Sequence, residues 1–246
     1  MEEFTSGQFG RHGTAGTPLR RDPYEGGLDP ELGTPDWNGE TPEEGTVAGT
    51  GTTTVGLATE DGVAIATDTR ASLAGRFVAN KNVRKVEQIH PTAAMTLVGS
   101  VGGAQSFIRS LRAEADLYEA RRGEDISIEG LATLAGNFAR GGPYFAISPI
   151  LGGVDDSGSH VFSIDPAGGV MSDDYVASGS GLQLAYGVLE GAYDPGLSME
   201  GAEAAAVEAV EAASERDTAS GDGVTVARVS SDGVGIERLD DADVSA

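Results

Sequence analysis

The sequence contains no cysteine in its 246 residues. Disulfide bridges, zinc–thiolate sites, iron–sulfur clusters and a cysteine nucleophile are therefore excluded. The three histidines, His12, His90 and His160, are far apart and lack the spacing of metal ligands, so we expect no metal site and no cofactor. No apolar run approaches the roughly 18 residues that cross a bilayer, and the N-terminus has no signal-peptide pattern. These absences predict a cytoplasmic protein without a membrane partner.

Positive charge is also scarce. The chain has 16 basic and 39 acidic residues, a formal net charge of −23, which disfavours nucleic acid and anionic membranes as partners. Lysine is the rarer basic residue and occurs only as Lys81 and Lys85. An acidic, lysine-poor composition suggests a cytoplasm rich in salt, and an acidic mesophilic protein is the alternative.

The chain divides near residue 51. Residues 1–51 are rich in glycine and proline and have neither the helical nor the strand period, which predicts a flexible leader. Residues 52–246 are long enough for one domain with a substantial core. Within them, strand patterns come in blocks at 52–58, 62–68, 93–99, 144–154, 160–166, 173–178, 224–230 and 234–239. Helical patterns lie at 102–123, 127–141, 180–193 and 198–217, with Gly123 ending the first and Ser127 capping the second. Such blocks indicate an α+β architecture in which helix pairs cover antiparallel sheets.

The boundary between the two parts has a chemical interpretation. Residues 51–54 read Gly-Thr-Thr-Thr, so cleavage after Gly51 would make Thr52 the first residue of the remaining chain. An N-terminal threonine combines a hydroxyl nucleophile with its own α-amine, whose ordinary pKa of about 7.7 to 8 suits a general base at neutral pH. Gly51 suits such a cleavage because, without a Cβ atom, it lets the backbone adopt the strained geometry in which the hydroxyl can attack the Gly51 carbonyl. A plain start of a strand is the alternative for these residues alone.

Further motifs favour the N-terminal nucleophile over a plain start of a strand. They are GTTTVG at 51–56, ATDTRAS at 66–72, KNVRKVEQI at 81–89, GSVGGAQ at 99–105, HVFSIDPAGG at 160–169, ASGSG at 177–181, AYGVLE at 185–190 and RDTASGDG at 216–223. In this order they closely resemble the catalytic β-subunits of archaeal 20S proteasomes, in the N-terminal nucleophile hydrolase superfamily. The resemblance covers residues 51–238. It implies a four-layer αββα sandwich with residues 1–51 as a propeptide that the chain removes itself.

The resemblance also implies roles for individual residues. Thr52 would be the nucleophile, and Asp68 and Lys85 would form a charged pair beside its hydroxyl. Arg84 competes with Lys85 for the basic position, because the preceding segment is one residue longer than in the best-known relatives. We prefer Lys85, since VEQI follows it in the family's register and a guanidinium holds its proton too firmly for the role. The backbone N–H of Gly99 would be the oxyanion donor. Three further residues would hold the freed amine: Ser180, Asp217 and Ser220.

The same resemblance implies a substrate site and partners. Small or apolar residues would line the first specificity pocket, and the backbone of Ser72 would pair with an extended peptide; the lining residues are Ala71, Leu97, Val101 and Val83. Large apolar side chains are expected to fit best. The implied partners are other β-subunits in heptameric rings, outer α-subunit rings, a regulatory unfoldase ATPase and unfolded polypeptides. A non-catalytic ring subunit and a hydrolase of small amides are the alternatives, although the apolar pocket disfavours the second.

Overall fold

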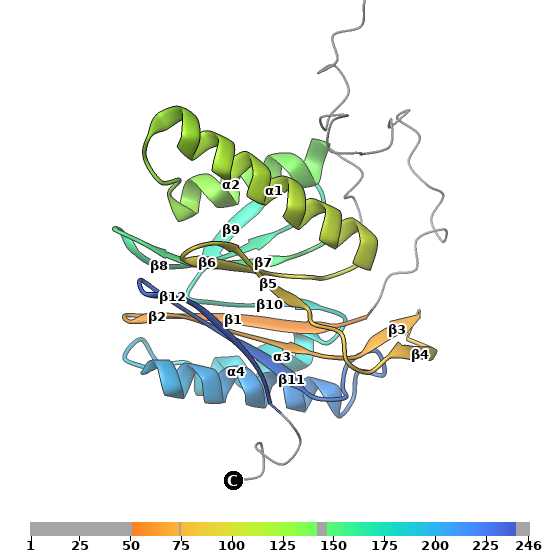
Figure 1. Ribbon diagram of the computed structural model, residues 1–246. Helices are drawn as coiled ribbons and strands as arrows, with labels where there is room; N and C mark the ends of the chain where they lie inside the picture. The colour runs from red at the N-terminus through yellow and green to blue at the C-terminus, as the bar shows by residue number, and fades with distance from the viewer. Residues whose placement is uncertain (1–50, 74, 142–146, 240–246) are drawn as a thin grey trace, which may run out of the picture. The chain divides into compact units, whose positions relative to one another are not determined.

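The computed structural model describes residues 51–73, 75–141 and 147–239, which all lie within one compact unit of the chain, 37–246. Two five-stranded sheets face each other in the middle of this unit (Figure 1). The first sheet has the order β10-β1-β2-β11-β12, with strands Tyr175–Gly179, Thr53–Thr59, Gly62–Asp68, Val224–Ser230 and Gly233–Leu239. The second has the order β5-β6-β7-β8-β9, with strands Val86–His90, Ala93–Thr96, Ile150–Asp155, Gly158–Ile164 and Val170–Asp173. Every neighbouring pair in both sheets is antiparallel.

A pair of helices covers the outer face of each sheet. Helices α1 (Val101–Arg122) and α2 (Ile128–Gly141) pack on the second sheet, and α3 (Leu182–Ala192) and α4 (Met199–Ser214) pack on the first (Figure 1). The α1 helix ends at Gly123, whose φ of 71° is left-handed, and the Ser127 hydroxyl accepts a hydrogen bond from the Gly130 amide at the start of α2. The predicted αββα sandwich and both helix signals are confirmed.

Strand β2 lies at the centre and is buried along its whole length. Its side chains alternate between two cores because neighbouring residues of a strand point to opposite faces. Val63 and Ile65 belong to the core between the two sheets, whereas Ala64 and Ala66 belong to the core beneath α3 and α4. The strand therefore reads as a continuous apolar run, and its last residue, Asp68, is carried into a buried position.

Three strands lie in a stretch without a clear strand pattern in the sequence. The irregular stretch before residue 86 contains a small two-stranded sheet, β3 (Ala71–Leu73) and β4 (Phe77–Asn80), and β5 follows it. All four residues of β4 are exposed, so no alternation of polar and apolar residues marks it. The single strand expected at 173–178 was wrong in extent, because β9 and β10 meet there and belong to different sheets. The first residues of the strand expected at 144–154 lie outside the described residues.

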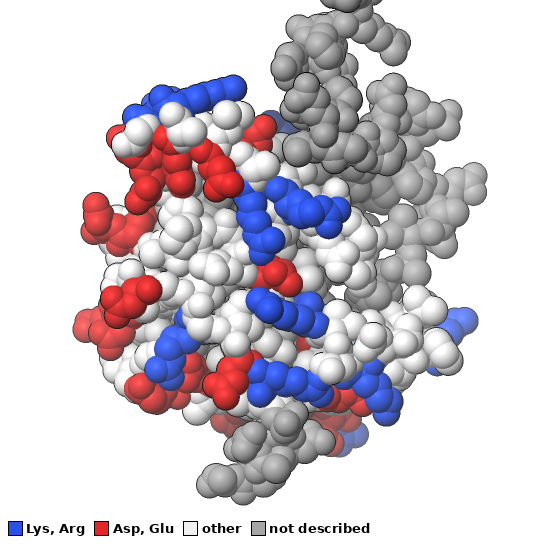
Figure 2. Space-filling model, in the orientation of Figure 1, with Lys and Arg blue, Asp and Glu red and all other residues white. Residues whose placement is uncertain are grey.

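Exposed carboxylates occupy hairpin turns at one end of the sandwich. Glu60 and Asp61 lie in the β1–β2 turn, Asp156 in the β7–β8 turn and Asp232 in the β11–β12 turn. Figure 2 shows acidic side chains gathered along this edge, at the left of the view. None of the described helices is long and apolar enough to span a bilayer.

The β7–β8 turn also gives a pH-dependent prediction. Burial alone raises the pKa of Asp155, but hydrogen bonds from Ser157, from the backbone amide of Ile128 and from His160 lower that pKa from 3.8 to about 2. A carboxyl whose folded pKa is depressed contributes stability above its ordinary pKa and loses that contribution as pH falls through the folded value. We therefore expect Asp155→Asn to lower the free energy of unfolding by a constant amount above about pH 4 and by progressively less toward pH 2. Denaturant unfolding of both chains across this range measures the difference, and a difference independent of pH would contradict the assignment.

Candidate active site

Thr52 lies at the entrance to β1, at the end of the sandwich away from the acidic turns. Its neighbour Thr53 pairs with Gly179 of β10, and Thr54 pairs with Thr67 of β2, so both flanking strands fix the chain at this point. Only 1% of Thr52 is exposed. The threonine is thus held at the edge of the first sheet with its hydroxyl facing inward.

Two charged side chains converge on the Thr52 hydroxyl. Its Oγ1 donates to Asp68 Oδ1 at 2.8 Å, and Lys85 Nζ lies 2.8 Å from the same Oγ1. Lys85 Nζ and Asp68 Oδ1 are 2.7 Å apart, which closes a triangle of three buried groups. Asp68 ends β2 in the first sheet, whereas Lys85 precedes β5 in the second. The site therefore exists only because the two sheets face each other.

The Asp68 carboxylate accepts five hydrogen bonds. Besides the hydroxyl of Thr52 and the ammonium of Lys85, Oδ1 accepts the backbone amide of Thr53 at 3.0 Å. The other oxygen, Oδ2, accepts the amides of Arg70 at 3.1 Å and Gly221 at 2.9 Å. Five donors fix this side chain in one orientation, so it acts as a rigid anchor for Thr52 and Lys85.

Lys85, and not Arg84, lies beside the Thr52 hydroxyl. Lys85 is 3% exposed, whereas the Arg84 side chain is 55% exposed, donates to the carbonyl of Val86 and lies near Glu87. Burial lowers the pKa of Lys85 from its ordinary value, although the charge of Asp68 and the hydrogen bond to it act in the opposite direction. An ammonium with a lowered pKa gives up its proton more readily than an exposed lysine does.

A second group surrounds the backbone nitrogen of Thr52. This nitrogen donates to Ser180 Oγ at 3.2 Å, and Ser180 Oγ donates to Asp217 Oδ2 at 2.6 Å. Ser220 Oγ also donates to Asp217 Oδ2 at 2.6 Å and lies 2.8 Å from the hydroxyl of Thr53. Ser180 does not cap a helix, because the residue at the start of α3 is Gly181. The three residues predicted to hold the amine are therefore brought together around the atom that would become that amine.

Gly51 precedes Thr52 in a confined position. A Cβ atom at residue 51 would lie 1.9 Å from Cβ of Ala219 and 3.0 Å from Ser180 Oγ. No side chain can be accommodated there without moving the turn that carries Asp217. Lys85 Nζ lies 3.5 Å from the Gly51 carbonyl oxygen, so a cation is already close to the peptide bond between residues 51 and 52.

A small pocket opens beside Lys85. Its lining residues include all four side chains predicted for the specificity pocket and also Gly99; they are Ala71, Val83, Lys85, Leu97, Gly99, Val101 and Ala104. Ala104 was not predicted, since a small residue in the first turn of a helix carries no signal of its own. Gly99 has a φ of 99°, a conformation that favours glycine. Ser72 lies in β3 next to Ala71, and its backbone pairs with Val78 of β4.

Two features near the site were not anticipated from the sequence. Thr53 reaches the second group through its hydroxyl, and an ion pair between Arg70 and Asp222 lies next to Asp68 and its partner Gly221. Asp222 stands within the RDTASGDG motif, which was the available signal for its importance. Among the described residues, no three His, Cys, Asp or Glu side chains form a group that could hold a metal ion.

Comparison with known proteins gives consistent matches over this chain. A family model described as "Proteasome subunit" matches residues 48–229. The chain is 66% identical to "Proteasome subunit beta" of Halorhabdus utahensis over 90% of this chain and 92% of that protein. It is 60% identical to "Proteasome subunit beta 1" of Haloarcula marismortui over 98% of both chains, and 66% identical to "Proteasome subunit beta 2" of the same organism over 87% and 93%.

Proposed function

The chain belongs to the proteasome β-subunit family, and from that premise we propose that it is a catalytic subunit, a threonine endopeptidase that exposes its own nucleophile by cleavage between Gly51 and Thr52. The observation that carries the proposal is the buried triangle of Thr52 Oγ1, Asp68 Oδ1 and Lys85 Nζ, with all three separations between 2.7 and 2.8 Å. A non-catalytic ring subunit has no use for a buried lysine and aspartate on one threonine hydroxyl. Burying an ammonium and a carboxylate costs desolvation free energy, and well-packed apolar side chains would serve a purely structural role as well or better.

The first reaction removes residues 1–51. The Thr52 hydroxyl oxygen attacks the carbonyl carbon of Gly51, and the hydroxyl proton passes to the neutral amine form of Lys85 Nζ, 2.8 Å away. The bond between that carbon and the Thr52 nitrogen then breaks, Lys85 returns the proton to this nitrogen, and an ester joins Gly51 to Thr52 Oγ1. Water hydrolyses the ester, which releases the leader as a carboxylate and regenerates the hydroxyl. Thr52 is left with a free α-amine.

The second reaction repeats this chemistry on a polypeptide substrate. The freed amine accepts the hydroxyl proton as Thr52 attacks the scissile carbonyl, and it returns that proton to the leaving amine. Ser180, Asp217 and Ser220 orient the amine. The backbone amide of Gly99, on the pocket wall beside Lys85, stabilises the oxyanion. Water then cleaves the acyl-enzyme ester, so that one hydroxyl performs both reactions.

The lining of the site favours a peptide substrate with an apolar side chain. The pocket beside Lys85 is lined mainly by alanine, valine and leucine. A hydrolase of small amides would need polar groups that grip its substrate. In the proposed assembly, heptameric β-rings stack between α-subunit rings in the cytoplasm, and an unfoldase ATPase delivers unfolded chains to the enclosed sites.

We expect the mature protein to begin at Thr52. Intact-mass measurement of the chain in active particles tests this, because removal of residues 1–51 leaves one defined product with a free threonine amine. The precursor should accumulate only before assembly. A full-length chain in particles that hydrolyse peptides would contradict the proposal, and so would a mature N-terminus at Thr53 or Thr54.

A further inference from the structure

The turn between α4 and β11 has an unusual backbone. Gly221, Asp222 and Gly223 have φ angles of 140°, 64° and 117°, and Asp222 is the one non-glycine residue with positive φ among those that the structure describes. Positive φ costs a residue with a side chain on the order of 1 kcal/mol, although aspartate tolerates it better than most. A glycine would avoid this cost, and glycine is used on both sides. The aspartate side chain must therefore contribute something that offsets the strain.

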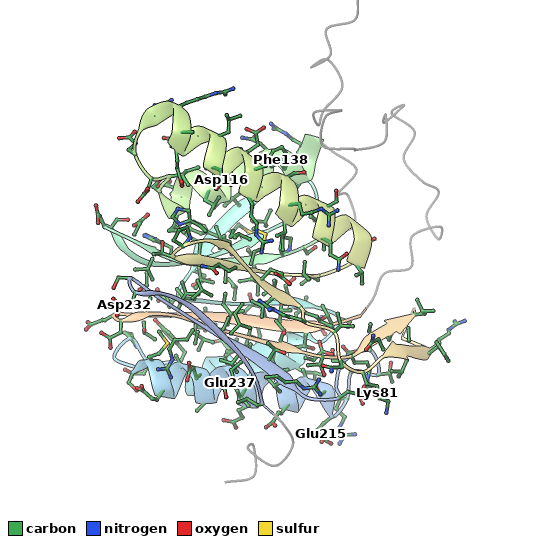
Figure 3. The ribbon with its side chains drawn as sticks, in the orientation of Figure 1. Lys81, Asp116, Phe138, Glu215, Asp232 and Glu237 are labelled. Atoms are coloured by element: carbon green, nitrogen blue, oxygen red, sulfur yellow. The ribbon has the colours of Figure 1, made fainter. Side chains whose placement is uncertain are left out.

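That contribution is an ion pair. Asp222 Oδ2 lies 2.7 Å from Arg70 Nε, and the two side chains are only 16% and 23% exposed. The hydrogen bond from Arg70 is the main cause that lowers the pKa of Asp222. Lys81, labelled in Figure 3, adds a weaker contact to the other oxygen at 3.5 Å. The Asp222 carbonyl oxygen accepts a hydrogen bond from the hydroxyl of Thr69 at 2.7 Å. The backbone and the side chain of Asp222 therefore both contact the segment that follows β2.

Arg70 fixes the turn at further points. Its Nη1 donates to the carbonyl of Thr218 at 3.1 Å. Its guanidinium also lies against Gly221, where a Cβ atom would be 2.6 Å from Nη2. The backbone amides of Arg70 and Gly221 both donate to Asp68 Oδ2. One arginine thus connects the carboxylate that anchors Thr52 with the turn that carries Asp217.

The Arg70–Asp222 ion pair lies in the turn that carries two of the residues around the Thr52 nitrogen. Asp217 and Ser220 lie in the same turn. Asp217 is connected to the Thr52 nitrogen through Ser180, whose Oγ donates to Asp217 Oδ2 at 2.6 Å and accepts from the Thr52 nitrogen at 3.2 Å. A shift of the turn would move Asp217 away from Ser180 while leaving the pocket unchanged, because the pocket residues come from β3, α1 and the segments beside β5 and β6.

We propose that Arg70 and Asp222 are positioning residues: their ion pair sets the position of the 217–223 turn, and through it the orientation and the pKa of the Thr52 amine. This inference rests on the proposed function. It adds to the catalytic groups a pair that touches neither substrate nor nucleophile.

Asp222→Asn tests the proposal, because asparagine tolerates positive φ but carries no charge. The full-length chain is expressed in a haloarchaeal host, and particles containing it are purified. We expect kcat for an apolar peptide to fall about 10- to 100-fold, the usual effect of a small misplacement of catalytic groups, with KM unchanged. The acid limb of the pH–kcat/KM profile should move to lower pH, because a carboxylate that moves away no longer favours the protonated amine.

Two further variants separate positioning from folding. Asp222→Gly removes the carboxylate but suits the backbone conformation, so it should keep the melting temperature and still lose kcat. Arg70→Lys keeps the positive charge but lacks the planar guanidinium group. Its kcat should therefore be lower than that of the unmodified protein and higher than that of Arg70→Gln. The matched control is Glu203→Gln, which breaks a partly exposed ion pair with Arg228 on the α4 face, remote from the 217–223 turn, and should leave kcat and the pH profile unchanged.

The outcomes are distinguishable. A lowered kcat with a shifted acid limb in both Asp222 variants supports the proposal. A lowered melting temperature with an unchanged kcat and pH profile, measured per processed chain, overturns it and leaves the proposed function intact. Failure of the proposed function appears separately, as peptide hydrolysis that survives Thr52→Ala.

Discussion

Thr52→Ala should leave residues 1–51 attached and abolish peptide hydrolysis in the same protein. The proposed function assigns both reactions to one hydroxyl oxygen, and alanine lacks that oxygen while retaining the backbone that pairs with β2 and β10. Loss of a nucleophile of this kind reduces kcat by about 10⁶-fold, which for peptide substrates is the limit of detection. Mass measurement of the chain and hydrolysis of an apolar peptide by the same preparation test the two losses together.

Thr52→Ser is the matched control for this variant. Serine keeps the hydroxyl and removes only a methyl group, so it should retain part of both the processing and the hydrolysis. Folding is not expected to suffer in either variant, because the packing around β1 comes chiefly from Val55 and Leu57. Separable effects, with leader removal intact and hydrolysis lost or the reverse, would show that two different groups perform the two reactions.

Lys85→Arg should lower kcat by roughly 10²–10³-fold, the size of effect seen when one electrostatic stabiliser is removed. The substitution keeps a positive charge, so a role in charge alone predicts little change. Lys85 lies within 2.8 Å of two oxygens in a space that leaves it 3% exposed, and a guanidinium is larger and planar. Burial lowers the pKa of Lys85, whereas arginine remains protonated throughout the accessible pH range.

Arg84→Lys supplies the control for Lys85→Arg at the adjacent position. Its side chain is directed to solvent, so the variant should hydrolyse peptides at the normal rate and be processed at Gly51. Steady-state kinetics on both variants, with the processed fraction measured by mass, distinguishes the two positions. A near-normal Lys85→Arg together with a defective Arg84→Lys would transfer the basic role to residue 84.

Local patterns in the sequence determined most of the secondary structure. The buried run of β2, the left-handed Gly123 at the end of α1 and the cap at Ser127 each depend on residues within a few positions of one another, so their signals lie side by side in the chain. The block order of strands and helices gave the layered architecture for the same reason. Scarcity of lysine made Lys85 conspicuous, and its motif gave the role that the structure makes geometrically possible.

Only the tertiary structure decided which groups meet. Thr52 and Ser180 are 128 positions apart, and no periodicity connects them; their grouping with Asp217 came from the resemblance to a family. The division between β9 and β10, the confinement of Gly51 by Ala219 and the Arg70–Asp222 contact had no counterpart in the sequence analysis. The periodicity of apolar residues indicates which face of a helix or strand is buried. The packing of the two sheets determines which strand ends face each other, and the candidate site lies between such ends.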